Sequence, residues 1–340
     1  MKNIKLNSLI ILLLSLFFII FVLKDNLFET IQILKNADGW WIVLAIIIYL
    51  VHLYVESLAL FVILSQKEKQ YSFVKILKLQ IMTKFFNGIT PFASGGQPLQ
   101  VYELKKENIP VYNGAIIIVE NFILFQTAIM ILGLSGVIIN KIFHLFKFDP
   151  IITNLFILGF IINAIILIVV YSSSISESLN KKIAKMITFF LIRMKIVKDK
   201  EKKRQQLDEF FRRYYQGFLE LRRNKKLVIK AISLQVLSLC LLFLVPQLVF
   251  NGLNVPHELN IISSIVAGTY VFITGSFVPI PGGTVGIEFA FLCFYANFVP
   301  KELMPPALIM WRFITYYAPM VAGAFVYNLF PNAAVTQKEA

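Results

Sequence analysis

Charged residues are scarce in this chain, and that scarcity decides the class of protein. Only 15% of the 340 residues are Asp, Glu, Lys or Arg, whereas soluble domains average about 25%. Apolar residues make up 58% of the chain, and the mean hydropathy is +0.74. This composition excludes an ordinary soluble domain. It predicts an all-α, polytopic integral membrane protein that forms a single transmembrane domain over residues 1–340.

Cysteine and histidine are rarer still. The chain has two Cys and three His. Cys240 and Cys293 lie in apolar runs, which favours buried hydrophobic residues over a disulfide or a metal pair. The sequence also lacks the phosphate-binding loop GxxxxGK[ST], the nucleophile elbow GxSxG and the zinc motif HExxH. We therefore expect no catalytic residues, no metal and no cofactor, and we expect that the chain is not an enzyme.

Long apolar runs are what the sequence has in abundance. A helix needs about 20 apolar residues to cross the hydrocarbon layer, and about eight runs are predicted to do so. They cover residues 6–23, 40–64, 114–139, 148–171, 227–250, 261–278, 285–299 and 306–330. The first run lacks a small-residue cleavage site, so we expect a retained helix rather than a signal peptide. The sixth and seventh runs are short, and they form either two crossings or a broken pair that does not cross.

Positive charge is concentrated in one loop and sets the predicted orientation. Residues 172–226 carry 16 Lys or Arg against 6 Asp or Glu, and the positive-inside rule places this loop in the cytoplasm. With eight crossings, both termini are then cytoplasmic as well. We attribute the net charge of +14 to topology and to contact with anionic lipid headgroups, not to nucleic-acid binding.

The same loop contains apolar residues at helical spacing with arginines between them. They are Leu207, Phe210, Phe211, Tyr214, Phe218 and Leu221. One interpretation is an amphipathic helix that lies on the membrane surface and holds anionic lipid. The favoured interpretation is a helix that docks on the spans.

Two stretches place helix breakers where spans are expected. Residues 85–103 read FFNGITPFASGGQPLQVYE, and residues 273–288 read ITGSFVPIPGGTVGIE. Each has a proline, then a glycine pair, then a glutamate. Broken backbone is tolerated in hydrocarbon only where protein buries it or where it lines a cavity. Paired interruptions are typical of transporters built from inverted repeats, so we predict two re-entrant elements that form an inverted-repeat-like pair.

Several polar residues lie inside predicted spans. They include Glu120, Asn121, Glu288 and Arg312. Charge within a membrane is costly and is a functional-site hypothesis by default. Arg312 either belongs to a binding site or pairs with Glu288 or Glu120 for structure. His52 and Glu56 are four residues apart on one helix face, and a structural pair is favoured for them.

The two broken stretches resemble the hallmark stretches of a known family. FNGITPFASGGQPLQVYELKKENIP (86–110) and FVPIPGGTVGIEFAF (277–291) are similar to those of the lysylphosphatidylglycerol synthase/flippase transmembrane family. This is the flippase-like membrane domain of the multiple peptide resistance factor, here in a stand-alone form, and the resemblance covers roughly residues 5–330. It implies a multi-pass protein of the bacterial cytoplasmic (inner) membrane. The substrate-binding residues that it implies are Asn87, Pro91, Gly95, Gly96, Gln97, Glu103, Pro279, Pro281, Gly282, Gly283, Gly286 and Glu288.

The chain departs from the bifunctional relatives in one respect. Those relatives carry a soluble aminoacyl-transfer domain after the membrane part, whereas this chain ends ten residues after Phe330, so we expect no synthesis of lysyl-lipid. The predicted function is a lipid flippase or scramblase for an anionic or aminoacylated phospholipid or glycolipid, with Glu120, Asn121 and Arg312 added to the binding residues. The alternatives are a membrane enzyme and a scaffold acting on a lipid-linked sugar or a lipid headgroup. The expected partners are anionic membrane lipids, a separately encoded lipid synthase or glycosyltransferase, and a second copy in a homo-oligomer.

Overall fold

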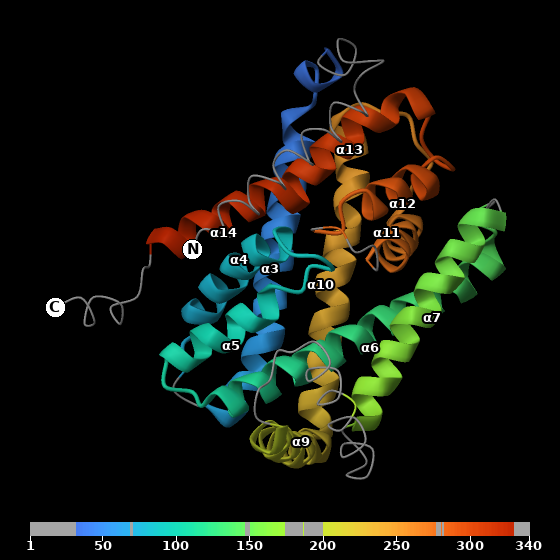
Figure 1. Cartoon of the computed structure of the whole chain (residues 1–340). Coiled ribbons are helices and arrows are strands. Elements are labelled where there is room, and N and C mark those ends of the chain that lie inside the picture. Colours follow the sequence, from blue (N-terminus) through green and yellow to red (C-terminus); the bar gives the residue numbers. More distant parts are fainter. Residues whose placement is uncertain are drawn as a thin grey trace.

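The protein is a bundle of helices (Figure 1). A computed structural model describes residues 32–68, 71–146, 150–173, 186, 200–276, 280 and 282–329. Four of its helices are long and apolar enough to cross a membrane: α3 (Gly39–Lys67), α6 (Val111–Phe143), α7 (Pro150–Ser173) and α10 (Lys225–Gly252). They confirm the all-α, polytopic class and the predicted spans at 40–64, 114–139, 148–171 and 227–250. The predicted span at 6–23 lies outside the described residues.

Helices α3 and α10 pack along each other in the centre of the molecule (Figure 1). Asp38 caps α3 by accepting the N–H of Trp40 at 2.9 Å. The backbone N–H of Asp38 in turn donates to the carbonyl of Gly252 at 2.6 Å, at the end of α10. A Cβ on Gly252 would lie 2.6 Å from Cδ1 of Ile42. The glycine therefore allows the end of α10 to approach the start of α3 closely.

Two helical hairpins flank this central pair. The first joins α4 (Phe73–Gly88) to α5 (Gly96–Lys106), and the second joins α11 (Ile261–Gly275) to α12 (Gly286–Tyr295). At 1.5 Å per residue even α4 is only about 24 Å long, less than the roughly 30 Å of hydrocarbon. The runs predicted at 261–278 and 285–299 are therefore a broken pair of short helices. Figure 1 shows the hairpins on either side of α3 and α10, with the turn between α4 and α5 directed toward the second hairpin.

The last apolar run is one path of three helical pieces. After a 3₁₀ turn, η1 (Lys301–Leu303), α13 (Met304–Arg312) continues through the π-helical turn η2 (Phe313–Tyr317) into α14 (Ala318–Leu329). Helix α14 packs against α4, where a Cβ on Gly323 would lie 2.4 Å from the carbonyl oxygen of Ile81. The run predicted at 306–330 is thus helical, but a π-helical turn interrupts it. Such turns occur frequently at functional sites.

The basic loop contains an amphipathic helix, α9 (Lys200–Arg223). Tyr214, Phe218 and Leu221 on its apolar face are buried. The Tyr214 hydroxyl donates to the carbonyl of Val170 in α7 at 3.2 Å, and the Phe218 ring contacts that of Tyr171. These contacts confirm the favoured interpretation of a docking helix. The side chain of Phe211 lies outside the described part.

Buried side chains form two apolar clusters. One lies among α10, α11, α12 and α13, where the rings of Phe291 and Trp311 stack with centroids 4.5 Å apart. The other lies among α3, α4, α5, α6 and α9. Each hairpin therefore rests on its own cluster, which fixes the position of its turn.

Candidate functional site

The first broken motif is held in shape by its own side chains. Oδ1 of Asn87 accepts the N–H of Gly96 at 2.8 Å. Oγ1 of Thr90 accepts the N–H of Gly95 at 2.7 Å and donates to the carbonyl of Phe86 at 2.8 Å. Side-chain oxygens of this kind satisfy the N–H groups that a helix leaves unpaired at its start. The candidate residue Asn87 therefore caps α5.

The glycine pair of this motif is required by close packing. A Cβ on Gly95 would lie 2.6 Å from Cγ2 of Thr90, and one on Gly96 would lie 2.4 Å from Oδ1 of Asn87. The rest of the turn is exposed, including the candidates Pro91 and Gln97. The motif therefore presents a rigid base and an accessible tip.

The second broken motif depends on left-handed backbone. Gly282 and Gly283 have φ angles of 64° and 65°, which glycine adopts at little cost. Val285 has a φ of 72°, an outlier for a β-branched residue. Helix α12 then begins at the candidate Gly286. The candidates Pro279 and Pro281 lie outside the described residues.

The two motifs contact each other directly. The N–H of Gly282 donates to the carbonyl of Thr90 at 3.3 Å. The hydroxyl of Tyr316, in the π-helical turn, donates to the carbonyl of Gly88 at 3.0 Å, and the side chain of Thr284 hydrogen-bonds to the same tyrosine. A Cβ on Gly282 would lie only 2.2 Å from the Tyr316 hydroxyl oxygen. Tyr316 therefore joins the end of α4 to the turn before α12.

A buried ion pair lies beside this contact. Nε of Arg312 is 2.8 Å from Oε1 of Glu288, and the two residues are 5% and 1% exposed. Both carboxylate oxygens of Glu288, and Nε and Nη2 of Arg312, lack a partner with hydrogen-bond geometry among the described residues. The guanidinium carbon is 5.0 Å from the centroid of the Tyr316 ring and 5.2 Å from that of Trp311. The site therefore brings two charged side chains and two aromatic rings together, and several polar atoms of the charged pair still lack a hydrogen bond.

The other polar candidates lie in separate pairs. Glu120 of α6 is fully buried and accepts from Nζ of Lys67 at 2.7 Å. Glu103 pairs with Lys106 at 2.6 Å within α5. Oδ1 of Asn121 accepts from the side chain of Gln235 at 3.0 Å. Of the predicted charged candidates, the structure brings Glu288 and Arg312 together and places Glu103 and Glu120 with other partners.

Some residues of these contacts were not among the site residues predicted from the sequence. Tyr316 follows Arg312 by four positions, a spacing that puts both on one helix face, so a signal was present. Lys67 and Thr90 carried no comparable signal. Glu56 lies 3.9 Å from His52 but pairs more closely with Lys84 at 2.6 Å. Within the described part of the chain, no group of three His, Cys, Asp or Glu side chains is arranged to hold a metal ion.

The sequence matches a known protein family over most of its length. Residues 8–323 match the family described as the lysylphosphatidylglycerol synthase transmembrane region. The chain belongs to this family. This family member is 24% identical over 313 residues to a UPF0104 membrane protein of Archaeoglobus fulgidus, covering 88% of this chain and 89% of the relative. It is 25% identical over 327 residues to a UPF0104 membrane protein of Methanocaldococcus jannaschii, covering 95% of each.

Proposed function

We propose that this family member is a lipid flippase or scramblase that moves an anionic or aminoacylated phospholipid or glycolipid across the membrane. The observation that carries the proposal is the contact between the two broken hairpins beside the buried pair of Glu288 and Arg312. Family membership supports a lipid-handling role. The chemistry of the contact supports movement of a charged headgroup.

Broken backbone at the contact provides a polar environment between apolar helices. Non-helical N–H and C=O groups persist at membrane depth only where protein buries them or where they line a cavity. Here the hairpins satisfy part of this requirement for each other, through Gly282 and Thr90. A headgroup that enters between them would replace such internal hydrogen bonds, while its acyl chains stay in the surrounding lipid.

Arg312 is the residue that we assign to the phosphate of the headgroup. A buried ion pair is costly unless further hydrogen bonds satisfy it, and Arg312 and Glu288 have polar atoms without partners. A guanidinium binds phosphate through two parallel hydrogen bonds. Phosphate therefore competes with Glu288 for Arg312 and supplies what the pair lacks.

Glu288 has the complementary role. When a phosphate takes its place at Arg312, the carboxylate becomes an isolated buried charge, which is strongly unfavourable. It then accepts either an amino group of the headgroup or a proton. When the lipid leaves, the pair forms again, and the site returns to its starting state.

Proteoliposomes that contain a fluorescent phosphatidylglycerol test this assignment. Its movement between leaflets is followed by quenching from outside. We expect Arg312→Gln and Glu288→Gln to slow movement roughly tenfold or more, because a charge-assisted hydrogen bond contributes about 1.5–3 kcal/mol. Glu107→Gln is the matched control, since this acid forms an exposed pair with Lys75 away from the hairpin contact. It should transport at the wild-type rate.

A double variant separates function from folding. Removing one member of a buried pair leaves an uncompensated charge and costs about 3–5 kcal/mol, so either single variant is at risk of unfolding. Arg312→Gln/Glu288→Gln removes both charges and keeps two amides of similar size. We expect this variant to be folded and inactive. Wild-type movement by the folded double variant would refute the proposal.

A further inference from the structure

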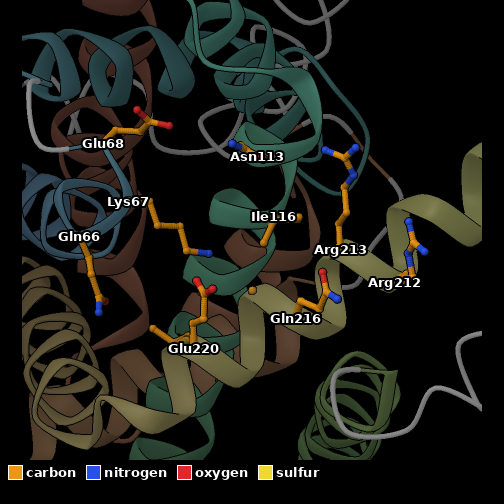
Figure 2. A pocket seen from close by; sticks show the side chains of 11 residues that line it. Gln66, Lys67, Glu68, Asn113, Ile116, Arg212, Arg213, Gln216 and Glu220 are labelled. Carbon is orange, nitrogen blue, oxygen red and sulfur yellow. The ribbon is translucent and has the colours of Figure 1, made fainter.

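A second polar region lies away from the hairpin contact, beneath α9. An open pocket of about 750 Å³ is lined by the end of α3, the first turns of α6 and one side of α9 (Figure 2). Its volume is in the range of small-ligand sites, about 300–1,000 Å³, and most of the residues that line it are polar or charged. This combination suits a charged polar group.

Lys67 supplies the strongest electrostatic feature of the pocket. Figure 2 shows its ammonium group extending into the pocket from α3. One of its N–H groups donates to Oε1 of Glu120 at 2.7 Å. An ammonium has three donors, so it retains capacity for a ligand. Oε2 of Glu120 is buried and has no hydrogen-bond partner among the described residues, so the ion pair is incompletely satisfied.

Gly217 has no side chain, and this leaves space beside the ion pair of Lys67 and Glu120. A Cβ at this position would lie 3.0 Å from Cγ2 of Ile116, 3.2 Å from Nζ of Lys67 and 3.4 Å from Oε1 of Glu120. Helix α9 therefore faces the ion pair at a residue with no side chain. A larger residue there would occupy the space beside the ammonium.

The rim adds charge of both signs from α9. Arg213 is already held by Glu209, with Nη2 and Oε1 2.6 Å apart. Arg212 is exposed and forms no ion pair within the described residues. Figure 2 shows the Glu220 carboxylate directed into the pocket. The pocket thus offers a cationic donor and an acceptor side by side at Lys67 and Glu220, and a second cationic group, Arg212, on the opposite side of its rim.

We infer that this pocket is a ligand site for a phosphate ester that also carries hydroxyl or amino groups. The phosphate is bound by Lys67, whose donors are not fully used, and Glu220 accepts from the hydroxyl or amino groups. Arg212, on the opposite side of the rim, adds positive charge that attracts the anion. The source of the ester is either a lipid headgroup or a small soluble metabolite. The inference stands apart from the proposed transport role, because binding here requires no movement of lipid.

Binding to the purified chain in a nonionic detergent tests this inference. The probes are short-chain phosphatidylglycerol and glycerol 3-phosphate, titrated calorimetrically. Lys67→Gln/Glu120→Gln replaces the ion pair by two amides, so no buried charge is left unpaired. We expect it to weaken binding roughly tenfold or more, in line with the loss of a charge-assisted hydrogen bond of about 1.5–3 kcal/mol. Arg222→Gln is the matched control, because it removes an exposed arginine from the same helix outside the pocket.

Each outcome decides the inference. Binding of either probe that is lost in the double variant and kept in Arg222→Gln supports it. Glycerol 3-phosphate binding as tightly as the lipid would name a soluble ester as the ligand, and binding of the lipid alone would name a headgroup. The inference is overturned if neither probe binds the wild-type chain. It is also overturned if the folded double variant binds as well as the wild type, or if the control loses as much affinity.

Discussion

The most discriminating prediction concerns two adjacent glycines that share one conformation. Gly282 and Gly283 have nearly the same positive φ, 64° and 65°. An alanine at either position therefore incurs the same left-handed strain, about 1–2 kcal/mol. What differs is the space that the new methyl group would enter.

The neighbours of each glycine determine how much stability its alanine variant loses. At Gly282 the Cβ would lie 2.2, 2.5 and 2.6 Å from three atoms at the polar end of the Tyr316 ring, whereas at Gly283 the nearest atom is the flexible Cδ1 of Ile287 at 2.9 Å. Displacing the ring adds an overpacking cost of about 1–3 kcal/mol. It also breaks the hydrogen bond from Tyr316 to Gly88, a net loss of about 1 kcal/mol. We expect Gly283→Ala to cost about 1–2 kcal/mol and Gly282→Ala about 3–6 kcal/mol in total.

Thermal unfolding of the purified variants in detergent measures this difference, with lipid movement in proteoliposomes as the functional readout. Gly282→Ala should unfold at a clearly lower temperature and lose transport, while Gly283→Ala should stay closer to the wild type in both. Gly282→Ala/Tyr316→Phe then tests the cause, since removing the hydroxyl relieves the closest contact and should recover part of the stability. Equal effects of the two alanines, or a larger effect at Gly283, would show that contact with Tyr316 does not cause the difference.

Two further predictions concern regions outside the contact. Tyr214→Phe removes the hydrogen bond to Val170 that joins α9 to α7; it should lower the free energy of unfolding by about 1 kcal/mol, and an unchanged melting temperature would contradict this. Burial lowers the pKa of His257, in the loop after α10, below its ordinary value of 6.5, so the unfolded chain binds a proton that the folded protein does not. The stability that His257 contributes is therefore complete above pH 6.5 and falls as the pH drops below that value; His257→Gln should flatten this decline in a series of melting curves, and an identical pH profile would contradict it.

The long spans could be predicted because hydrophobic length alone decides them, and the broken hairpins because proline and glycine are costly in a span. Helix α4 escaped prediction as a separate element. Its lysines lower its apparent hydropathy, and one of them, Lys84, is compensated by Glu56 of α3. That compensation is a tertiary contact, so hydropathy along the chain does not record it.

The candidate site could be predicted only in part, because tertiary contacts decide which of its residues pair. The sequence left open whether Arg312 pairs with Glu288 or with Glu120. The structure shows the pair with Glu288. The pairing of Glu120 with Lys67 joins residues 53 positions apart on different helices, which no local pattern specifies. The capping role of Asn87 likewise depends on how the chain folds back at the turn.

The central claim, that this family member moves lipid, is tested most directly by the wild-type chain alone. Purified protein in proteoliposomes would be given phosphatidylglycerol, its lysyl form, a diglucosyl diacylglycerol and a polyprenyl-phosphate sugar, each labelled, with protein-free liposomes as the baseline. We expect at least one anionic or aminoacylated lipid to cross much faster than this baseline. Movement of every lipid at the baseline rate, by folded protein, would contradict it.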